Sequence, residues 1–344
     1  MRLERLPCKP LERAKNFSVS PSYIVGCTGQ KAVILDRQGT LLHTVEKLRY
    51  VYSARISPDE TKLLLISNEN RFYIVDMRSF AVRGVTVKVP WNQNLEGRGC
   101  WTFDGNGVLI PVSRRTDALN STLRRYCVED LSQYQDFLAD KYVLNNIFPL
   151  KSLESYLLIG YDRQRDGRNY FIRFDGRQYR EFPLDVRGSM AILGAAMDEK
   201  NGTVTVAYVG GCSQFTLEGE KIGEMFHPEP KDKTFSFAGS FSHLLAEEES
   251  RQRLKELSTS LHLENISARD YINKYALSSC GKYIHLASQS GFYLLDAATG
   301  KILAAVPETY GVQNFEELSS DTIAVATWSG VKLYRLCGQD GTCL

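Results

Sequence analysis

Residues 56–89 read ISPDETKLLLISNENRFYIVDMRSFAVRGVTVKV, and this stretch decides the fold. Ser57, Pro58 and Asp59 favour a turn, and a short apolar strand follows them. A second turn leads into the strand FYIVD, which ends at Asp76 before a further turn and a third strand. The stretch therefore predicts a small antiparallel sheet without a helical crossover.

The same pattern recurs along the chain. Its other clear copy is LSSCGKYIHLASQSGFYLLDAATGKILAAVP at 277–307, where Asp296 takes the place of Asp76. With weaker copies there are seven units, whose mean spacing lies within 40–47 residues when one interruption is left out. The units cover residues 20–45, 56–89, 104–139, 153–184, 199–226, 277–307 and 319–338.

A further short strand precedes most units, as VYSARIS does at 51–57. Four antiparallel strands per unit make the blade of a β-propeller. The last unit ends after its third strand, and we expect residues 2–8 (RLERLPC) to supply the fourth, because an open edge promotes aggregation. The alternative is a disordered N-terminal tail. The sequence thus predicts one all-β domain over 1–344, a seven-bladed β-propeller closed by its N-terminal strand.

Two strands carry a resemblance to known propellers. FYIVDMRSF at 72–80 and FYLLDAATGKIL at 292–303 resemble the third strand and following turn of YVTN/PQQ-like and WD-repeat propellers. The resemblance covers the whole chain as a pattern, but the Trp-Asp and Gly-His signatures of WD repeats are missing. It implies the propeller fold and no particular function.

Residues 229–272 interrupt the repeat between the fifth and sixth units. Leu254, Leu257 and Leu261 are spaced as on one face of a helix over 242–264, and Ser242 can cap its start. We expect a helical insert that either packs against the side of the propeller or covers one face as a lid or docking helix. The segment TFSFAGSF at 234–241 is alternatively a strand of the fifth blade.

The alternation of antiparallel strands places the loops. If the strands of each blade are named A to D in chain order, the B–C and D–A loops share one face and the A–B and C–D loops share the other. The long, arginine-bearing loops belong to the first group, so we expect a partner or ligand on the B–C/D–A face. The candidate residues are Tyr50, Trp91, Arg98, Arg114, Arg115, Asn145, Arg163, Arg165, Arg168 and Arg187.

The arginines have two interpretations. Guanidinium groups bind carboxylates and phosphates, so these loops fit an anionic ligand or an acidic partner segment. Interleaved carboxylates such as Asp162 and Asp166 could instead neutralise them, which would leave solvated hairpin tips. Tyr50, Arg98 and Asn145 are also expected at the mouth of the axial channel.

Local catalytic motifs are missing from the sequence. The five histidines do not pair with Cys, His or Glu at metal-ligand spacing, and no phosphate loop or nucleophile elbow occurs. His285 is expected to be a buried structural residue. The inner strands offer Asp104, Glu316 and Glu317 as acid–base candidates. We expect no catalysis, no metal and no cofactor.

The composition of the chain limits the classes of partner that we expect. The 42 Lys and Arg against 40 Asp and Glu give a net charge of +2, so no overall field attracts nucleic acid or an acidic membrane. No apolar run approaches the ~20 residues that cross a bilayer. The charged N-terminus has no apolar signal core, and the eight cysteines are spaced singly, which is typical of the cytoplasm. We expect a monomeric cytoplasmic scaffold for a protein partner; the alternative is a small-ligand or hydrolytic site at the channel mouth.

Overall fold

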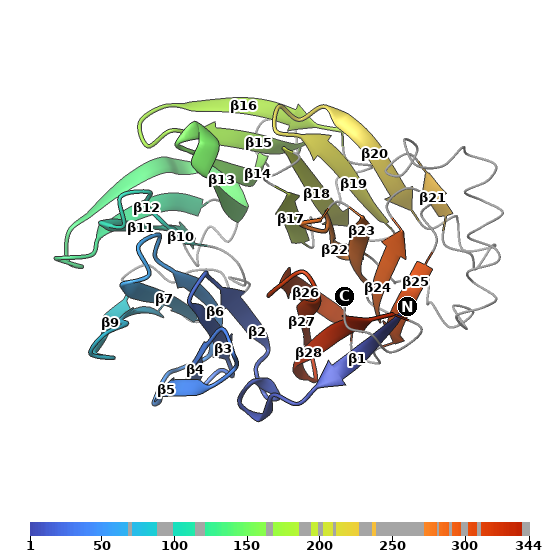
Figure 1. Ribbon diagram of the computed structural model, residues 1–344. Coiled ribbons are helices and arrows are strands. Elements are labelled where there is room, and N and C mark those ends of the chain that lie inside the picture. Colours follow the sequence, from blue (N-terminus) through green and yellow to red (C-terminus); the bar gives the residue numbers. More distant parts are fainter. Residues whose placement is uncertain are drawn as a thin grey trace. The chain divides into compact units, whose positions relative to one another are not determined.

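The computed structural model of the chain is built almost entirely of β-strands (Figure 1). It describes residues 1–67, 71–87, 99–113, 121–162, 168–185, 194–198, 202–208, 211–226, 236–238, 272–280, 282–288, 291–296, 302–307 and 311–338. The chain divides into two compact units, Cys8–Leu184 and Met1–Pro7 with Asp185–Leu344.

The unit Cys8–Leu184 contains four antiparallel blades. Its strands are β2 (Asn16–Val19), β3 (Tyr23–Cys27), β4 (Ala32–Asp36), β5 (Leu41–Val45), β6 (Val51–Ile56), β7 (Lys62–Ser67), β8 (Arg71–Asp76), β9 (Val82–Thr86), β10 (Cys100–Trp101), β11 (Gly107–Ser113), β12 (Ser121–Cys127), β13 (Tyr134–Leu150), β14 (Ser155–Asp162), β15 (Arg168–Phe174) and β16 (Tyr179–Leu184). Blade 1 is β2–β5 and blade 2 is β6–β9. Blade 3 is β10–β12 with the first part of β13, and blade 4 is the second part of β13 with β14–β16. Two short 3-10 helices, η1 (Lys9–Leu11) and η2 (Lys151–Leu153), precede β2 and β14.

Strand β13 joins blades 3 and 4 without a loop, so that their strands form one seven-stranded sheet (Figure 1). It pairs with β12 as far as Tyr142 and with β14 from Val143 onward. The register is irregular where the partner changes, and Leu138 has a φ of 53°. The short strand expected before the unit at 153–184 is therefore present, but as the second part of a 17-residue strand.

The other unit contains three blades. Its strands are β17 (Gly194–Asp198), β18 (Thr203–Tyr208), β19 (Gly211–Thr216), β20 (Lys221–Phe226), β21 (Ser236–Ala238), β22 (Ile272–Leu277), β23 (Tyr283–Ser288), β24 (Gly291–Asp296), β25 (Ile302–Pro307), β26 (Val312–Glu317), β27 (Thr322–Thr327), β28 (Gly330–Cys337) and β1 (Arg2–Leu6). Blade 5 is β17–β20 with β21 as a fifth strand, blade 6 is β22–β25, and blade 7 is β26–β28 with β1.

The N-terminal strand completes blade 7, as predicted. Strand β1 pairs antiparallel with β28, with Arg2 opposite Cys337 and Leu6 opposite Leu333. The pairing gives the last blade its fourth strand and covers the edge of β28.

The described residues cover only part of the insert. Strand β21 pairs with β20, so the alternative of a strand within 234–241 is confirmed for Ser236–Ala238. The predicted helix over 242–264 lies outside the described residues. The extent of the domain over 1–344 and the helical nature of the insert stay predictions.

The central strands of each blade are buried on both faces. In β7, Leu63 and Leu65 belong to the apolar cluster shared with blade 1, whereas Leu64 and Ile66 belong to the cluster shared with blade 3. Successive side chains of a strand point to opposite faces, which explains this division. Burial of each such side chain stabilises the fold by roughly 1.5–3 kcal/mol. The uninterrupted apolar run in the sequence is thus the consequence of a blade packed between two others.

Candidate functional site

Seven of the ten candidate residues lie outside the described part of the chain: Trp91, Arg98, Arg114, Arg115, Arg163, Arg165 and Arg187. Asn145 lies within β13, and its side chain is likewise outside the described part. Tyr50 and Arg168 are the two candidates whose side chains can be placed.

Arg168 begins β15 at the end of the B–C connection of blade 4, and it is exposed. Its register partner on β14 is Asp162, a buried carboxylate. Opposite charges that face each other across two antiparallel strands stabilise the pairing. Arg168 thus starts β15 directly opposite a carboxylate-bearing residue of the neighbouring strand.

Tyr50 lies in the D–A connection between β5 and β6 on the predicted face. Its side chain is 55% exposed, and its φ is 48°. A non-glycine residue in this left-handed region costs roughly 1–2 kcal/mol. The structure thus holds a large aromatic side chain in solvent in an unfavourable backbone conformation.

The connection that carries Tyr50 is fixed on both sides of this residue. The carbonyl oxygen of Arg49 accepts a hydrogen bond from Ser67 Oγ at 2.7 Å. Val51 exchanges two backbone hydrogen bonds with Gly29, at 2.8 and 2.9 Å. Because both neighbours are held, the backbone of Tyr50 has little freedom to relax.

The opposite face is built on a recurring A–B turn. In three blades a hydroxyl donates to an aspartate two residues later, and the pairs are Ser57–Asp59 (2.6 Å), Thr102–Asp104 (2.5 Å) and Ser319–Asp321 (2.6 Å). The hydrogen bond from Ser57 holds the pKa of Asp59 down, at about 2. The aspartates of these turns are therefore anionic acceptors that fix the turn.

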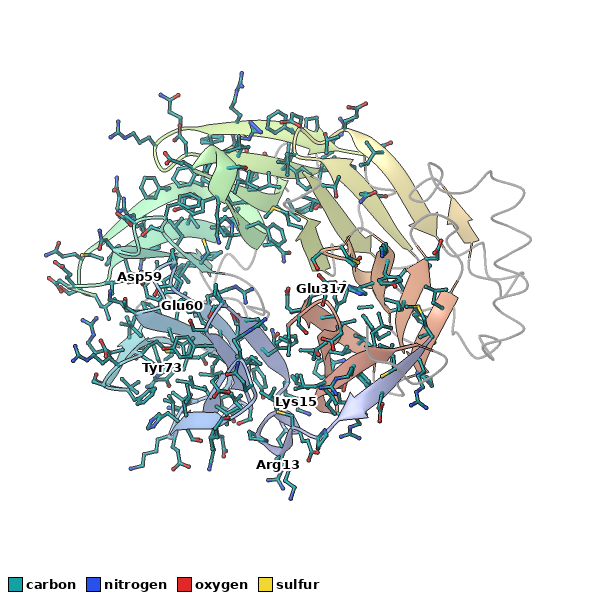
Figure 2. All side chains as sticks on the ribbon, in the orientation of Figure 1. Arg13, Lys15, Asp59, Glu60, Tyr73 and Glu317 are labelled. Atoms are coloured by element: carbon teal, nitrogen blue, oxygen red, sulfur yellow. The ribbon has the colours of Figure 1, made fainter. Side chains whose placement is uncertain are left out.

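Blade 6 has Cys280 at the aspartate position of this turn, with Sγ 3.3 Å from Ser278 Oγ. Glu317 of blade 7 accepts a hydrogen bond from the backbone N–H of Ser279 at 2.8 Å. A second oxygen of Glu317 lies 3.7 Å from Nδ1 of His285, which is 2% exposed, as expected for a structural histidine. Glu317, labelled in Figure 2, thus joins blades 6 and 7.

A groove of about 450 Å³ opens between blades 3 and 4 on the A–B/C–D side. It is bounded by the A–B turn of blade 3, the η2 connection of blade 4 and the turn between β15 and β16. The lining residues are Thr102, Phe103, Asp104, Leu109, Arg125, Phe137, Glu154, Tyr156, Phe174, Asp175 and Gly176. This is the face opposite to the one on which Tyr50 lies.

The floor of the groove is aromatic. Phe103 stacks on Tyr156 with 4.7 Å between ring centroids, and Phe137 lies 5.0 Å from Phe174. The hydroxyl of Tyr156 accepts a hydrogen bond from the backbone N–H of Phe103 at 3.3 Å, and burial raises the pKa of Tyr156. Phe103 and Phe137 are half-buried, so they present ring surface to the groove.

The rim of the groove carries three carboxylates and one guanidinium. Asp104, Glu154 and Asp175 are exposed acidic residues. Arg125 Nη2 lies 3.7 Å from Asp104 Oδ2, and both side chains are about half exposed. Asp175 Oδ1 accepts the backbone N–H groups of its own turn, so it is fixed in place. The rim is therefore net acidic.

Sequence reasoning singled out Asp104 in this groove and missed the rest. Phe103, Phe137 and Tyr156 are scattered over two repeat units, and an aromatic residue in a strand predicts a core position by default. Glu154 gave no signal, because its importance comes from its backbone conformation. The A–B turn of blade 4 lacks the Ser/Thr-x-Asp pattern of the turns in blades 2, 3 and 7. A comparison of these turns in the sequence could have identified this junction.

The described residues offer neither a cluster of metal ligands nor a membrane-spanning helix. They contain no group of three His, Cys, Asp or Glu side chains placed to hold a metal ion. They also contain no helix that is long and apolar enough to cross a bilayer.

Comparison with known proteins identifies the fold. No protein-family model and no curated protein matches the sequence. Among solved structures, the chain is similar to the β-propeller domain of Cps50 (Swd1) from Myceliophteria thermophila, with a TM-score of 0.63 and 9% sequence identity. The match covers 97% of this chain and 99% of that domain. The predicted seven-bladed β-propeller of four-stranded blades is thus confirmed, while nothing specifically supports the YVTN/PQQ type of repeat.

Proposed function

We propose that this propeller is a non-catalytic interaction scaffold, which binds a partner protein through its B–C/D–A face with Tyr50 as an anchor. Propellers present many loops on a rigid frame, and binding residues concentrate on such loops. Tyrosine suits this role because it supplies a large amphipathic contact with few rotatable bonds. The observation that carries the proposal is the exposed, left-handed Tyr50.

The conformation of Tyr50 has a cost that the fold does not recover. At 55% exposure its ring contributes little apolar burial, and glycine would adopt the same φ without strain. Strained backbone conformations cluster at functional sites, although a tight connection can also contain one without a binding role. An aromatic side chain that is held rigid before binding also loses less entropy when a partner covers it.

A pair of substitutions in the same connection tests the proposal. Tyr50→Gly removes the ring and the strain together. Lys47→Gly is the matched control, because Lys47 is exposed, lies in the same connection and has a φ of 58°. Both variants are expected to raise the free energy of unfolding in urea by about 1 kcal/mol.

Only Tyr50→Gly is expected to impair partner binding. Proteins retained from cell extract by the immobilised wild type and by Lys47→Gly should be lost from Tyr50→Gly. Each such protein, once purified, should bind Tyr50→Gly at least about tenfold more weakly, since an aromatic hot spot contributes 1.4 kcal/mol or more. Equal retention and equal affinity in the two variants would contradict the proposal.

We place this scaffold in the cytoplasm. Within the described part of the chain, Cys8, Cys27, Cys100, Cys127 and Cys280 carry free thiols. Free thiols persist in a reducing compartment, whereas secreted proteins oxidise them. Imaging of a tagged chain checks the location.

A further inference from the structure

Two A–B connections carry a glutamate in the left-handed region. Glu60 in blade 2 has a φ of 58° and Glu154 in blade 4 has a φ of 44°. In the corresponding turn of blade 3 the left-handed residue is Gly105, which needs no compensation. Each glutamate is therefore retained at a conformational cost.

For Glu60 the structure shows the contacts that offset this cost. Its carboxylate accepts hydrogen bonds from the N–H and the Oγ of Ser22 in blade 1, at 2.9 and 2.7 Å (Figure 2 labels Glu60). Glu60 thus holds two blades together. The carboxylate of Glu154 has no hydrogen bond or ion pair within the part of the chain that the structure describes, and it lies on the rim of the groove. Glu154 ends η2, where a left-handed residue is common, but its carboxylate adds no contact among the described residues that offsets the cost and is open to a ligand.

The dimensions of the groove fit a side chain of a partner. A volume of about 450 Å³ is within the range of ligand pockets, roughly 300–1,000 Å³. This volume is about that of a single turn of a helix with a diameter of about 10–12 Å, which is too little for a helical segment. One long side chain with its neighbouring backbone fills such a space.

The aromatic and acidic side chains that line the groove favour a ligand with a positive charge on an apolar stem. Stacked rings of Phe103 and Tyr156 attract a cation over their faces. The rim adds Glu154 and Asp175, whereas the charge of Asp104 is partly met by Arg125. Nucleic acids and anionic peptides are disfavoured by this rim.

We infer that the groove between blades 3 and 4 binds an arginine side chain from a basic segment of a partner protein. The aliphatic stem of the arginine packs along Phe137 and the guanidinium stacks on Phe103, where it pairs with Glu154. Arginine is favoured over lysine because its planar group both stacks on an aromatic ring and donates two parallel hydrogen bonds to a carboxylate. This site lies on the opposite face to Tyr50 and does not depend on it.

A titration with defined peptides tests the inference on the full chain. The probes are the blocked peptides Gly-Ala-Arg-Ala-Gly and its citrulline counterpart, which keeps the shape of arginine without its charge. Binding is followed by amide chemical shifts of the isotope-labelled protein at low salt. The arginine peptide is expected to give saturable shifts at Phe103 and Gly176, and to bind at least about tenfold more tightly than the citrulline peptide. Added salt should weaken it.

Two charge reversals provide the matched comparison. Glu154→Lys should weaken the arginine peptide at least about tenfold, because it replaces the pairing carboxylate by a like charge. Glu129→Lys is the control, since Glu129 is also exposed and lies in the turn between β12 and β13 on the same side, outside the groove. It should leave the affinity unchanged, as should Tyr50→Gly. Glu154→Gln, which removes the charge alone, should give an intermediate loss.

Several results would overturn the inference. They are an absence of saturable shifts, equal binding of the citrulline peptide, or equal losses in Glu154→Lys and Glu129→Lys. Equally tight binding of a lysine peptide would overturn the assignment to arginine. If Tyr50→Gly loses its partner while the arginine peptide still fails to bind wild type, the scaffold proposal stands and this inference falls.

Discussion

Two neighbouring blade junctions differ in how they are filled. Between blades 2 and 3, Trp101 is 4% exposed and packs into the shared apolar cluster, and its Nε1 donates to the carbonyl oxygen of Arg55 at 2.7 Å. Between blades 3 and 4 the same side of the sheets opens into the groove. The strands on both sides of each junction have the same antiparallel arrangement. The difference is therefore one of side chains and turns.

The register identifies the substitutions responsible. Trp101 pairs with Val108 one step before the A–B turn, and the residue at the same step in blade 4 is Pro149, which pairs with Tyr156. The next pair contains Leu150, where blades 2 and 3 have Ser57 and Thr102, so the hydroxyl-fixed turn cannot form. Pro149 provides a small ring where blade 3 has the indole of Trp101, and η2 replaces the hydroxyl-fixed turn. The space between blades 3 and 4 is therefore not filled.

The largest expected effect on stability comes from removing the indole that fills the junction between blades 2 and 3. Trp101→Ala should lower the free energy of unfolding by about 3–5 kcal/mol, because it leaves a cavity and an unpaired carbonyl. Urea denaturation followed by far-UV circular dichroism measures the change. Trp101→Phe, which mainly removes the indole donor, should cost about 1 kcal/mol.

A loss of stability below about 1 kcal/mol for Trp101→Ala would contradict this explanation of the two junctions, because so small a loss is typical of a substitution at the surface. The indole would then not be what distinguishes the two junctions.

The junction between blades 3 and 4 is fastened by polar groups elsewhere. Lys141 of β13 donates to Tyr179 Oη at 2.9 Å and pairs with Glu181 of β16. The hydroxyl of Tyr142, whose side chain is fully buried, donates to the same carboxylate of Glu181. Hydrogen bonds to charged groups are stronger than neutral ones, so these contacts keep blades 3 and 4 together beside the groove.

Removal of Glu181 should therefore have the second largest effect. Glu181→Ala leaves the buried Tyr142 hydroxyl and the Lys141 ammonium without their shared acceptor, and we expect a loss of about 2–3 kcal/mol. Tyr179→Phe is the control, because it removes one exposed donor–acceptor contact and should cost less than about 0.5 kcal/mol. If Glu181→Ala and Tyr179→Phe have the same small effect, apolar packing alone holds this junction. The measurement is again urea unfolding.

The sequence predicts the blades well because their strands obey simple rules. Runs such as LLLI (63–66) and FYIV (72–75) are apolar at every position, since β7 and β8 are covered on both faces, and the N-terminal strand was predicted from the missing edge of the last blade. The groove could not be predicted in the same way. It arises where Pro149 and Leu150 depart from the repeat, and that departure shows in the sequence only when the A–B turns of successive units are compared. Tyr50 was predicted on its face, but its left-handed backbone could not be.

The smallest expected effect is on the free energy of unfolding of variants at Glu60 and Glu154, the two glutamates with a left-handed backbone. Glu154→Gly should raise the free energy of unfolding by about 1 kcal/mol, because it relieves the left-handed backbone and removes no hydrogen bond seen among the described residues. Glu60→Gly relieves the same strain but loses both bonds to Ser22, so it should instead lower the free energy of unfolding by about 1 kcal/mol. Opposite signs in urea unfolding would mean that one glutamate stabilises the fold and the other is kept for a ligand. If Glu154→Gly is as destabilising as Glu60→Gly, Glu154 has a structural role, and the groove loses the carboxylate on which its specificity for arginine rests.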